Sequence, residues 1–572
     1  MATTQSNQMN VIHAIREYIN KMLEKIDGMK VLVLDQETAG IVSMVYTQSE
    51  ILQKEVFLFE KIDSGSAEKM THMKAVYFVR PTQHNVSKIA DELRNPKYSD
   101  YHLFFSNVIG SGFIDEIAKA DDKDLVKEVQ EFYADFYAVN QDSFNLNING
   151  ALTKNTLAWK SDINRIVEGV FSSLLALKRK PTIRYSEKSE ASKFLAATLN
   201  DKILKERDLF TFKQQSSLLL ILDRKDDPVT PLLHQWTYQA MVHELLGIHN
   251  NVVNLTGSKF DPTKKDHTPT APGQKKESKD VILSTEQDAF FKDNLYLNYG
   301  DLGASIKNLV DTYQEKMHTN ANIQTIDDMK KFIENYPNFQ KFSTTVSKHV
   351  SLMEELSKRI SEDFLMDISE IQQELACNHE HNTAYSTMVE VLENRKYNLQ
   401  DKLVLVLLYS LRYEDGRIWE LKELLAKSGL SNDEISLIST LHDYAGANKR
   451  EGDLFENKNL FRFVKQMATR GLNGVSNIYT QHKPLIHDIL HHIQNDKLSI
   501  QSYPFISPQT TREKPTDIII FVVGGITFEE CYNVFTFNSM NKGSGKVVLG
   551  GTNILNCKQF LDDLRGLRVL GK

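Results

Sequence analysis

Short apolar runs alternate with amphipathic stretches along the first quarter of the chain. The runs are continuously apolar, as strands are when both faces of their sheet are covered. The stretches between them, such as "NVSKIADELR", place apolar residues at helical spacing. The pattern therefore predicts a parallel sheet with helices on both faces. The expected strands are 31–35, 56–60, 75–79, 101–106 and 136–140.

A second α/β region is divided along the sequence. Strand-like runs occur at "LLLILD" (218–223), "DIIIFVVGG" (517–525) and "KVVLGGT" (546–552). The two C-terminal strands, with the helical patterns that follow them, are too few to form a domain alone. We expect them to pair with the strand at 218–223, so that everything between is an insertion.

The fold class predicted from these patterns is α/β plus α, because the inserted part has mainly helical spacing of its apolar residues. Within it, the polar segment 256–280 has too little apolar surface to fold and is expected to be a mobile surface loop. The predicted domains are an N-terminal parallel α/β domain over 1–140, a discontinuous α/β domain over 141–247 and 472–572, and an inserted, mainly helical domain over 248–471.

Charge, cysteine content and hydropathy argue against several classes of protein. The 68 basic and 75 acidic residues give 68 − 75 = −7, which argues against a general nucleic-acid binder. Three cysteines are too few for a disulfide framework and suggest a reducing compartment. The longest apolar runs are far shorter than the roughly 20 residues of a membrane helix, and the N-terminus does not resemble a secretory signal. We expect a cytoplasmic or peripheral protein.

Three aspartates follow the strand at 218–223. Asp223, Asp226 and Asp227 are of the type that binds a hard cation. However, Asp226 and Asp227 precede a proline and equally form a turn that leads into a helix capped by Thr230, while Arg224 could neutralise the carboxylates. The sequence offers no partner base and no further acidic cluster, so we favour a structural role for Asp223, Arg224, Asp226 and Asp227.

Two glycine-containing segments are candidates for phosphate binding, and neither fits. The segment after 101–106 has Gly110 and Gly112 but Asp115 at the third glycine position. The segment "KGSGKVVLGG" (542–551) has Val547 where a phosphate loop needs Ser or Thr, and it precedes a strand. We predict a hairpin-like loop there.

Two groups of histidines and cysteines could hold zinc only with further ligands. These groups are His487, His491 and His492, and Cys377, His379 and His381. No such ligands occur at a suitable spacing, and solvated helix faces are the favoured interpretation. The sequence therefore predicts no catalytic residue, no metal site and no cofactor.

Several long segments resemble one family, the SM (Sec/Munc-type) proteins, which bind SNAREs and regulate vesicle fusion. They are "MKVLVLDQETAGIVSMVYTQSEILQKEVFLFEKID", "LLLILDRKDDPVTPLLHQWTYQAMVHELLG", "ENYPNFQKFSTTVSKHVSLMEELS" and "DIIIFVVGGITFEECYNVFTFN". The resemblance covers essentially the whole chain, apart from the 256–280 loop and the region around Gly416. Segments such as "GVSNIYTQHKPLIHDIL" resemble the vacuolar-protein-sorting branch that serves the trans-Golgi network and endosomes.

The resemblance implies an arch of three domains and no enzymatic activity. It implies binding to a syntaxin-type SNARE and to the assembling SNARE complex, with endosomal tethering factors as further partners. It also implies a monomer that binds no nucleic acid, lies in the cytoplasm, and associates with Golgi, trans-Golgi and endosomal membranes through SNAREs. The alternative is an α/β nucleotide-binding protein or enzyme, which the lack of a phosphate loop or catalytic constellation disfavours.

The family binds SNAREs in two ways, and the resemblance places both on this chain. The SNARE N-terminal peptide is expected on the outer face of the first domain, along a helix in "GFIDEIAKADDKDLVKEVQEFY". The expected contacts are Phe113, Ile114, Ile117 and Val129. The alternative is that some of these side chains face the sheet instead.

SNARE helices are expected at a hairpin of the inserted domain, at about 300–376. Pro337 should break or bend a helix there. A helical partner needs apolar anchors at helical spacing, although such a stripe equally suits a core. The expected contacts are Pro337, Phe339, Phe342, Val346 and Val350.

Overall fold

The computed structural model describes most of the chain. The described residues are 9–64, 69–150, 156–212, 216–255, 280–321, 326–377, 380–414, 416–452, 454–455, 478–507, 514–541 and 545–570. The loop predicted over 256–280 lies outside them except for Asp280, and the predicted boundary at 471/472 also lies outside.

The first domain contains a five-stranded, wholly parallel sheet in the order β2-β1-β3-β4-β5. Its strands are β1 Lys30–Leu34, β2 Val56–Lys61, β3 Met70–Val79, β4 Tyr98–Phe105 and β5 Val126–Glu131. Its helices are α1 Val11–Glu24, α2 Gln36–Val45, α3 Gln48–Leu52, α4 Gln83–Arg94 and α5 Ser111–Ala120. The first four predicted strands and the parallel sheet are confirmed.

The helix predicted through Gly112 to Tyr133 is wrong in its second half. Helix α5 ends at Ala120, and the Asp121 carboxylate accepts hydrogen bonds from the backbone N–H groups of Leu125 and Val126. This side chain turns the chain into β5, which pairs with β4. The apolar residues fit both the spacing of a helix and that of a strand, and pairing with an open sheet edge favours the strand.

The second domain contains a six-stranded sheet in the order β6-β7-β13-β12-β9-β8. Strand β12 lies between β9 and β13 and is parallel to both, which confirms the predicted pairing across the insertion. The strands are β6 Tyr137–Asn140, β7 Ser143–Asn145, β8 Thr182–Tyr185, β9 Ser217–Asp223, β12 Asp517–Val523 and β13 Val547–Gly551. The helices are α6 Thr156–Ala176, α7 Glu190–Lys205, α8 Tyr238–Leu245, α19 Leu485–Gln494, α20 Phe528–Met540 and α21 Cys557–Leu570.

Three predictions for this region need correction. The strand expected at 136–140 in the first domain is β6 of the second sheet, where it pairs antiparallel with β7. Thr230 lies in a short 3₁₀ turn, and the next α-helix, α8, begins later at Tyr238. The loop before β13 connects α20 to a parallel strand and is therefore no hairpin.

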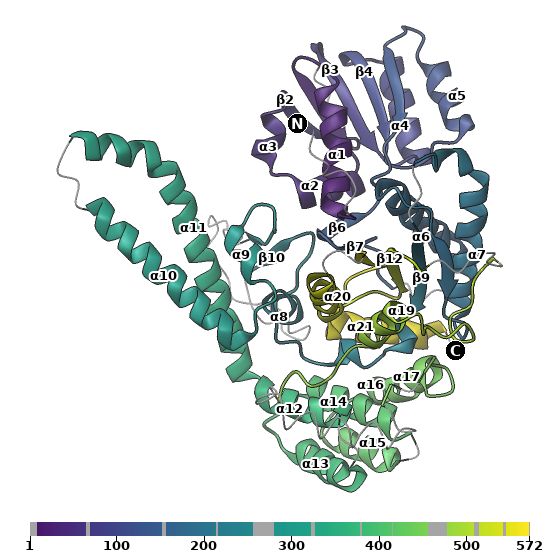
Figure 1. The fold of residues 1–572 in the computed structure, drawn as a ribbon, viewed down its shortest axis with the longest axis vertical. Coiled ribbons are helices and arrows are strands. Elements are labelled where there is room, and N and C mark those ends of the chain that lie inside the picture. The colour runs from purple at the N-terminus through teal and green to yellow at the C-terminus, as the bar shows by residue number, and fades with distance from the viewer. Residues whose placement is uncertain are drawn as a thin grey trace.

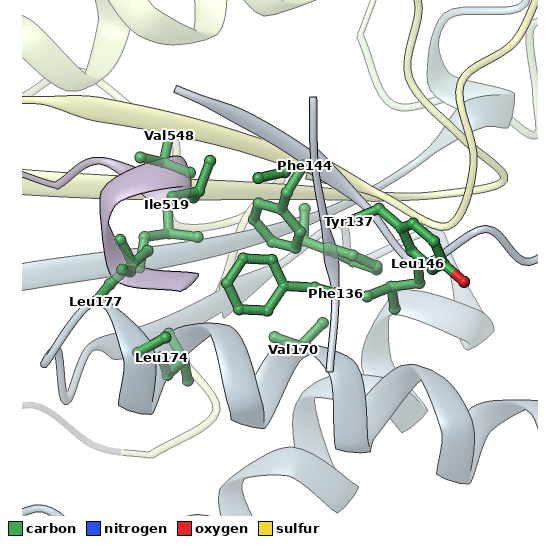
Figure 2. Packing of buried hydrophobic residues seen from close by; sticks show 14 of the residues in the cluster. Phe136, Tyr137, Phe144, Leu146, Val170, Leu174, Leu177, Ile519 and Val548 are labelled. Atoms are coloured by element: carbon green, nitrogen blue, oxygen red, sulfur yellow. The ribbon is translucent and has the colours of Figure 1, made fainter. Parts of the chain in front are cut away.

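The cores of the two sheets are continuous. Figure 2 shows Phe136 and Phe144, from the start of the second sheet, packed with Val170 and Leu174 of α6. The same cluster includes residues of α1, α2 and one face of the first sheet. An apolar run cannot show which sheet it joins when one core serves both, which explains the misplaced strand at 136–140.

The inserted domain is mainly helical, as predicted. Its helices are α9 Ala289–Asn294, α10 Tyr299–Ala321, α11 Ile326–Glu362, α12 Leu365–Cys377, α13 His381–Glu393, α14 Leu399–Arg412, α15 Ile418–Lys427, α16 Asn432–Ile435 and α17 Leu437–Ala445. A small antiparallel pair, β10 Val252–Asn254 and β11 Asp280–Ile282, precedes them. Helix α14 is buried from Asp401 to Arg412 and is the centre of one helical core.

The three parts form the expected arch, in which the α10–α11 hairpin projects far beyond the other elements (Figure 1). Helix α11 runs through Pro337 without a break, and Figure 1 shows its first turns at an angle to the rest. Among the described residues, no helix combines the length and the apolar character needed to cross a membrane.

Candidate functional site

The corner after β9, residues 223–233, is held by buried carboxylates. Asp223 ends the strand and accepts hydrogen bonds from the Ser189 hydroxyl at 2.5 Å, the Lys225 backbone N–H at 3.0 Å and the Tyr444 hydroxyl at 3.1 Å. Ser189 belongs to the second domain and Tyr444 to the inserted domain. Asp223 therefore joins two domains through one side chain.

The other two aspartates of the corner are equally well partnered. Asp226 accepts hydrogen bonds from the Ser186 hydroxyl at 2.7 Å and from the Glu451 N–H at 2.9 Å. Asp227 accepts from both the backbone and the hydroxyl of Thr230, at 3.0 and 2.6 Å. Both carboxylates are almost fully buried. Their lone pairs are thus directed to the protein's own donors.

Arg224 links this corner to a helix about 300 residues later. Its guanidinium is 2% exposed and donates two parallel hydrogen bonds to Glu530, at 2.8 and 2.9 Å. Such a bidentate pair fixes orientation as well as distance. Glu530 also completes a capping box with Thr527 at the start of α20. The corner therefore ties the two sequence-distant halves of the second domain together.

Opposite pKa shifts separate the two carboxylates of the corner. Burial alone would raise the pKa of Asp227, but the adjacent Arg224 holds it below its ordinary value. For Asp226, burial and then Asp223 raise the pKa to about 7 and outweigh the lowering by its hydrogen bonds and by Lys225. Asp227 is thus held as a paired anion, whereas ionisation of Asp226 is costly.

The crevice that a nucleotide would occupy in the first sheet is filled by the chain itself. Sheets with the strand order 2-1-3-4-5 bind ligands beyond the carboxyl ends of strands 1 and 3. There the Asp35 carboxylate caps α2 through the Thr38 N–H at 2.7 Å. It also accepts from the Arg80 N–H and the Asn85 amide, each at 2.7 Å. A carboxylate therefore stands at the helix N-terminus where phosphate binds in nucleotide sites.

A pocket at the surface of the first domain is formed by α1, the loop before α5, α5 itself, the end of β5 and the two residues after it. Its volume is about 560 Å³. Ile114 and Val129 of the predicted contacts line it, and their side chains are 42% and 38% exposed. The lining residues, termed the outer pocket, are Tyr18, Lys21, Ile109, Ile114, Val129, Gln130, Glu131, Phe132 and Tyr133.

The other two predicted contacts point into the domain. Ile117 is 3% exposed and belongs to the core between the sheet and its helices, and Phe113 packs against the same core. The alternative prediction, that some of these four side chains face the sheet, is therefore correct for Phe113 and Ile117. The helical spacing that relates Phe113 to Ile117 places both on one face of α5, and that face is the inner one.

Two polar residues of the outer pocket, Glu131 and Tyr133, are hydrogen-bonded to each other. The Glu131 carboxylate accepts hydrogen bonds from the Ile109 N–H at 2.8 Å and the Tyr133 hydroxyl at 2.7 Å. Burial and then Glu131 raise the pKa of Tyr133, so its hydroxyl stays a neutral donor. Sequence reasoning did not identify Tyr18, Ile109 or Tyr133, because the pocket joins three segments that only the fold brings together.

The hairpin places its predicted residues in different environments. The Tyr313 ring of α10 stacks on Phe339 of α11 at 5.7 Å and contacts Phe342 at 6.2 Å. Val346 is 7% exposed, whereas Val350 is 37% exposed. Phe339 and Phe342 thus join the two helices of the hairpin, and Val350 is the most accessible of the predicted apolar anchors in the part whose side chains are described.

Further along α11, a buried polar chain fixes the hairpin to the second domain. The His349 ring lies between the Tyr238 hydroxyl of α8, at 2.8 Å, and the Asp288 carboxylate, at 2.9 Å. Leu352 and Leu356 continue into a core shared with α8 and α9. The hairpin is therefore anchored at this level and projects beyond it.

The described residues contain no group of three or more histidine, cysteine or acidic side chains arranged to hold a metal ion. His379, one member of a group considered from the sequence, lies outside the described residues. The rings of His487 and His491 pack edge to face at 4.7 Å on α19. All three cysteines are free thiols.

The chain is similar over nearly its whole length to a set of known proteins. It is 62% identical over 563 residues to "Vacuolar protein sorting-associated protein 45" of Dictyostelium discoideum, covering 98% of both chains. It is 46% identical over 564 residues to the Homo sapiens protein of that name, covering 97% of this chain and 96% of that one.

Solved structures give the same result for the fold. "SM Protein Vps45 in Complex with Qa SNARE Tlg2" matches with a TM-score of 0.87 and 38% identity, covering 98% of both chains. The Unc18–syntaxin 1 complex from Monosiga brevicollis matches with a TM-score of 0.76 at 20% identity, a likeness of fold alone. The model of the Sec1 family matches residues 30–563. The chain therefore belongs to the Sec1 family of SM proteins.

Proposed function

We propose that this chain is a non-catalytic SM protein that binds a syntaxin-type SNARE and promotes SNARE assembly and vesicle fusion in trans-Golgi and endosomal transport. The observation that carries the proposal is the near-complete match to an SM protein solved with a Qa SNARE, at 38% identity over 98% of both chains. Close relatives named for vacuolar protein sorting support the transport branch.

The absence of catalysis is part of this proposal. The carboxylates of the corner, which are the most suggestive acids in the sequence, are taken up by Ser186, Ser189, Thr230 and Arg224. The Asp35 carboxylate fills the crevice that a nucleotide would need. Both observations support a scaffold over the alternative of a nucleotide-binding enzyme.

The outer pocket is proposed to receive the N-terminal peptide of the SNARE. It combines accessible aliphatic side chains, Ile114 and Val129, with the neutral hydroxyls of Tyr18 and Tyr133. Such a lining suits an apolar peptide side chain whose backbone needs a few polar contacts. Phe113 and Ile117 would shape this site from beneath.

The hairpin is proposed to contact SNARE helices as they assemble. Val350 offers an accessible apolar position, while Phe339 and Phe342 are partly accessible beside Tyr313. Val346 and Pro337 are proposed to shape the helix that presents these residues. The chain would act as a monomer in the cytoplasm, reach Golgi and endosomal membranes through SNAREs, and cooperate there with tethering factors.

The testing experiment uses the full chain as bait on detergent-solubilised membranes. A syntaxin-type SNARE should be enriched, and a synthetic peptide of its N-terminal residues should bind the chain in calorimetry. Ile114→Arg should abolish peptide binding, since an unpaired charge placed in an apolar pocket costs about 2–5 kcal/mol. The matched control is Leu399→Arg, at an apolar position that is 39% exposed at the start of α14 in the inserted domain.

Two results would contradict the proposal. One is recovery of no SNARE by a folded chain. The other is nucleotide hydrolysis that disappears in Asp226→Asn or Asp227→Asn while the fold persists. Equal peptide affinity of Ile114→Arg and wild type would move the peptide site away from the outer pocket.

A further inference from the structure

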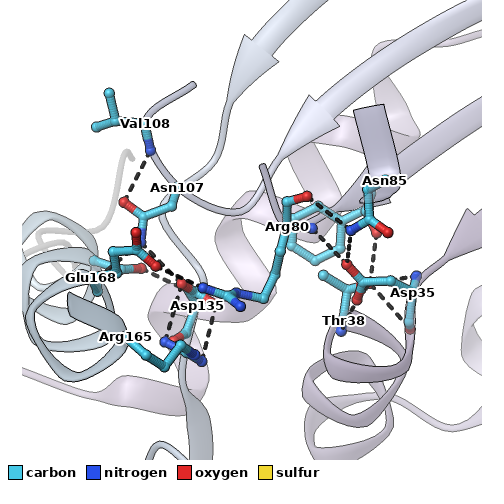
Figure 3. Close-up of polar contacts among 11 residues, drawn as sticks. Asp35, Thr38, Arg80, Asn85, Asn107, Val108, Asp135, Arg165 and Glu168 are labelled. Atoms are coloured by element: carbon cyan, nitrogen blue, oxygen red, sulfur yellow. Dashed lines mark hydrogen bonds and ion pairs between the residues drawn. The ribbon is translucent and has the colours of Figure 1, made fainter. Parts of the chain in front are cut away.

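In sheets of this strand order, ligands bind beyond the ends of β1 and β3. Arg80 follows β3 directly at that point. Its backbone N–H is held by Asp35, and its carbonyl accepts a hydrogen bond from the Asn85 amide at 2.9 Å. The main chain of Arg80 is therefore fixed from inside the first domain. Its side chain leaves the crevice and points toward the second domain (Figure 3).

The Arg80 side chain bridges two acids outside the sheet to which it belongs. Its Nε lies 3.0 Å from Asp135, in the segment that connects β5 to β6, and a terminal nitrogen lies 2.7 Å from Glu168 of α6. Burial alone would lower the pKa of Arg80, but Asp135 and then Glu168 raise it. A planar guanidinium can hold two carboxylates at fixed angles, which an ammonium group cannot.

Asp135 is the centre of this joint and is completely buried. Its carboxylate also accepts hydrogen bonds from Arg165 of α6 at 3.2 Å and from the Asn107 amide at 3.0 Å. Its backbone N–H donates to the Ser172 hydroxyl of α6 at 2.9 Å. The first domain, the connecting segment and α6 therefore meet at one carboxylate, as Figure 3 shows.

Apolar contact also joins the two domains, but it does not fix their orientation in the same way. One cluster extends from α1 and α2 to β6, β7 and α6. The hydrophobic effect is non-directional, so such an interface resists separation more than it resists tilting. The charged hydrogen bonds of Arg80 are directional. Apolar burial can hold the domains together, whereas directional hydrogen bonds can also set the angle between them.

We infer that Arg80 is a positioning residue that fixes the tilt of the first domain on α6 and thereby the spacing between the first domain and the α10–α11 hairpin. The crevice contacts hold the main chain of Arg80, and its side chain forms the joint to the second domain. The inference rests on the proposed function only where it predicts SNARE binding. The outer pocket is lined by α1, α5, β5 and the residues next to them, and no residue of α6 is among its lining residues, so we expect its geometry to change little with the tilt.

The tilt can be measured directly by a distance between two spin labels. Lys88 of α4 and Lys193 of α7 are exposed and lie in different domains. Cysteines would replace both in a Cys377→Ser background, because the other two cysteines are buried. Arg80→Met should broaden or shift the distance distribution, whereas Arg80→Lys should have a smaller effect. Arg94→Met, which removes an exposed arginine within the first domain, is the control.

The two modes of SNARE binding should respond differently to the substitution of Arg80. Arg80→Met is expected to weaken binding of a SNARE that lacks its N-terminal peptide by about tenfold, a difference of about 1.4 kcal/mol. The isolated N-terminal peptide should bind with unchanged affinity. A residue that merely stabilised the fold would change both affinities or neither. An unchanged distance distribution in Arg80→Met, or equal losses in both affinities, would overturn the inference.

A second variant covers the case in which Arg80→Met does not fold. Glu168→Gln removes one arm of the joint at a half-exposed residue and leaves Asp135 with its other partners. It should shift the label distance in the same direction, and an unchanged distance would overturn the inference. If the wild-type chain binds no SNARE, the proposed function fails, and the distance measurement still decides the role of Arg80.

Discussion

The corner after β9 and the outer pocket are opposites in sequence and in structure. The corner has five charged residues in unbroken succession, from Asp223 to Asp227, and every one that is buried has a partner. The outer pocket is formed mainly by apolar and aromatic residues from three segments, and two of its aliphatic residues, Ile114 and Val129, are exposed. The charged residues of the corner are mostly buried and paired, whereas exposed aliphatic side chains occur in segments that carry no distinctive motif.

The difference has a physical cause. A buried charge is tolerated only when partners replace its hydration, so a dense set of buried charges requires a dense set of long-range contacts. Arg224 and Glu530 satisfy this requirement from positions 306 residues apart. An accessible aliphatic group such as Ile114 needs no such compensation and remains available to another molecule.

The largest effect is expected where the corner loses one half of its buried ion pair. Glu530→Gln should lower the free energy of unfolding by about 3–5 kcal/mol, because Arg224 is left with an incompletely compensated buried charge. Urea unfolding would measure the loss. The neighbouring Glu529→Gln is the matched control, since burial and then Glu530 raise the pKa of Glu529 to about 7.

Removing the Glu529 charge should leave stability unchanged or increase it. Equal losses of unfolding free energy in the two variants would show that the ion pair between Arg224 and Glu530 contributes no more to stability than an unpaired acid does.

The next effect separates two neighbouring isoleucines of α5. Ile117→Ala should cost about 2–5 kcal/mol of unfolding free energy, because it leaves a cavity in the core. Ile114→Ala should change stability by no more than about 0.5 kcal/mol, as at other exposed positions. Peptide titration should give the reverse order, with the larger loss in Ile114→Ala. The same order in both measurements would refute the outer pocket as a binding surface.

Much of the fold follows from sequence, and the errors have a common origin. Strands β9, β12 and β13 are continuously apolar, so their pairing across the insertion could be predicted. Strand β5 was predicted as helix because its apolar residues fit both periods, and the turn made by Asp121 decided between them. Strand β6 was assigned to the wrong sheet because pairing partners are chosen in three dimensions.

The candidate sites show the same limit. The aspartates of the corner could be singled out in the sequence, and the capping-box spacing of Thr527 and Glu530 was a signal for the start of α20, but nothing local connects Glu530 to Arg224. Ile114 and Val129 were predicted, although on a helix that does not continue to Val129. Their common pocket depends on β5 lying beside α1.

A smaller effect concerns pH and distinguishes the two aspartates of the corner. The pKa of Asp226 is about 7 in the folded chain, raised by burial and then by Asp223, against about 3.9 when unfolded. The folded state therefore binds the extra proton between these values, and its contribution to stability falls as pH rises from about 4 to 7. Asp227 behaves oppositely, because its pKa is lowered and its contribution is lost in acid.

Asp226→Asn should remove the loss of stability with rising pH that Asp226 causes. The stability of wild type relative to this variant should fall by about 1–2 kcal/mol between pH 5 and 7, within the limit of about 1.4 kcal/mol per pH unit for one proton. Urea unfolding at several pH values would measure it. A constant difference across this range would show that Asp226 is ionised like an ordinary surface carboxylate.

The last prediction concerns Pro337, where we expect a local change in the shape and exchange of the hairpin. Proline has no backbone donor and disfavours a helix interior by about 3 kcal/mol relative to alanine, yet α11 continues through it. Pro337→Ala should therefore slow amide hydrogen exchange across 326–350 and favour a straighter hairpin. If that shape binds assembling SNAREs, their affinity should rise and liposome fusion should accelerate, with N-terminal peptide binding unchanged.

Lys341→Ala, at an exposed position of the same helix, is the control. Wild-type exchange and fusion in Pro337→Ala would mean that the bend has no role, and the hairpin would then act as a static surface.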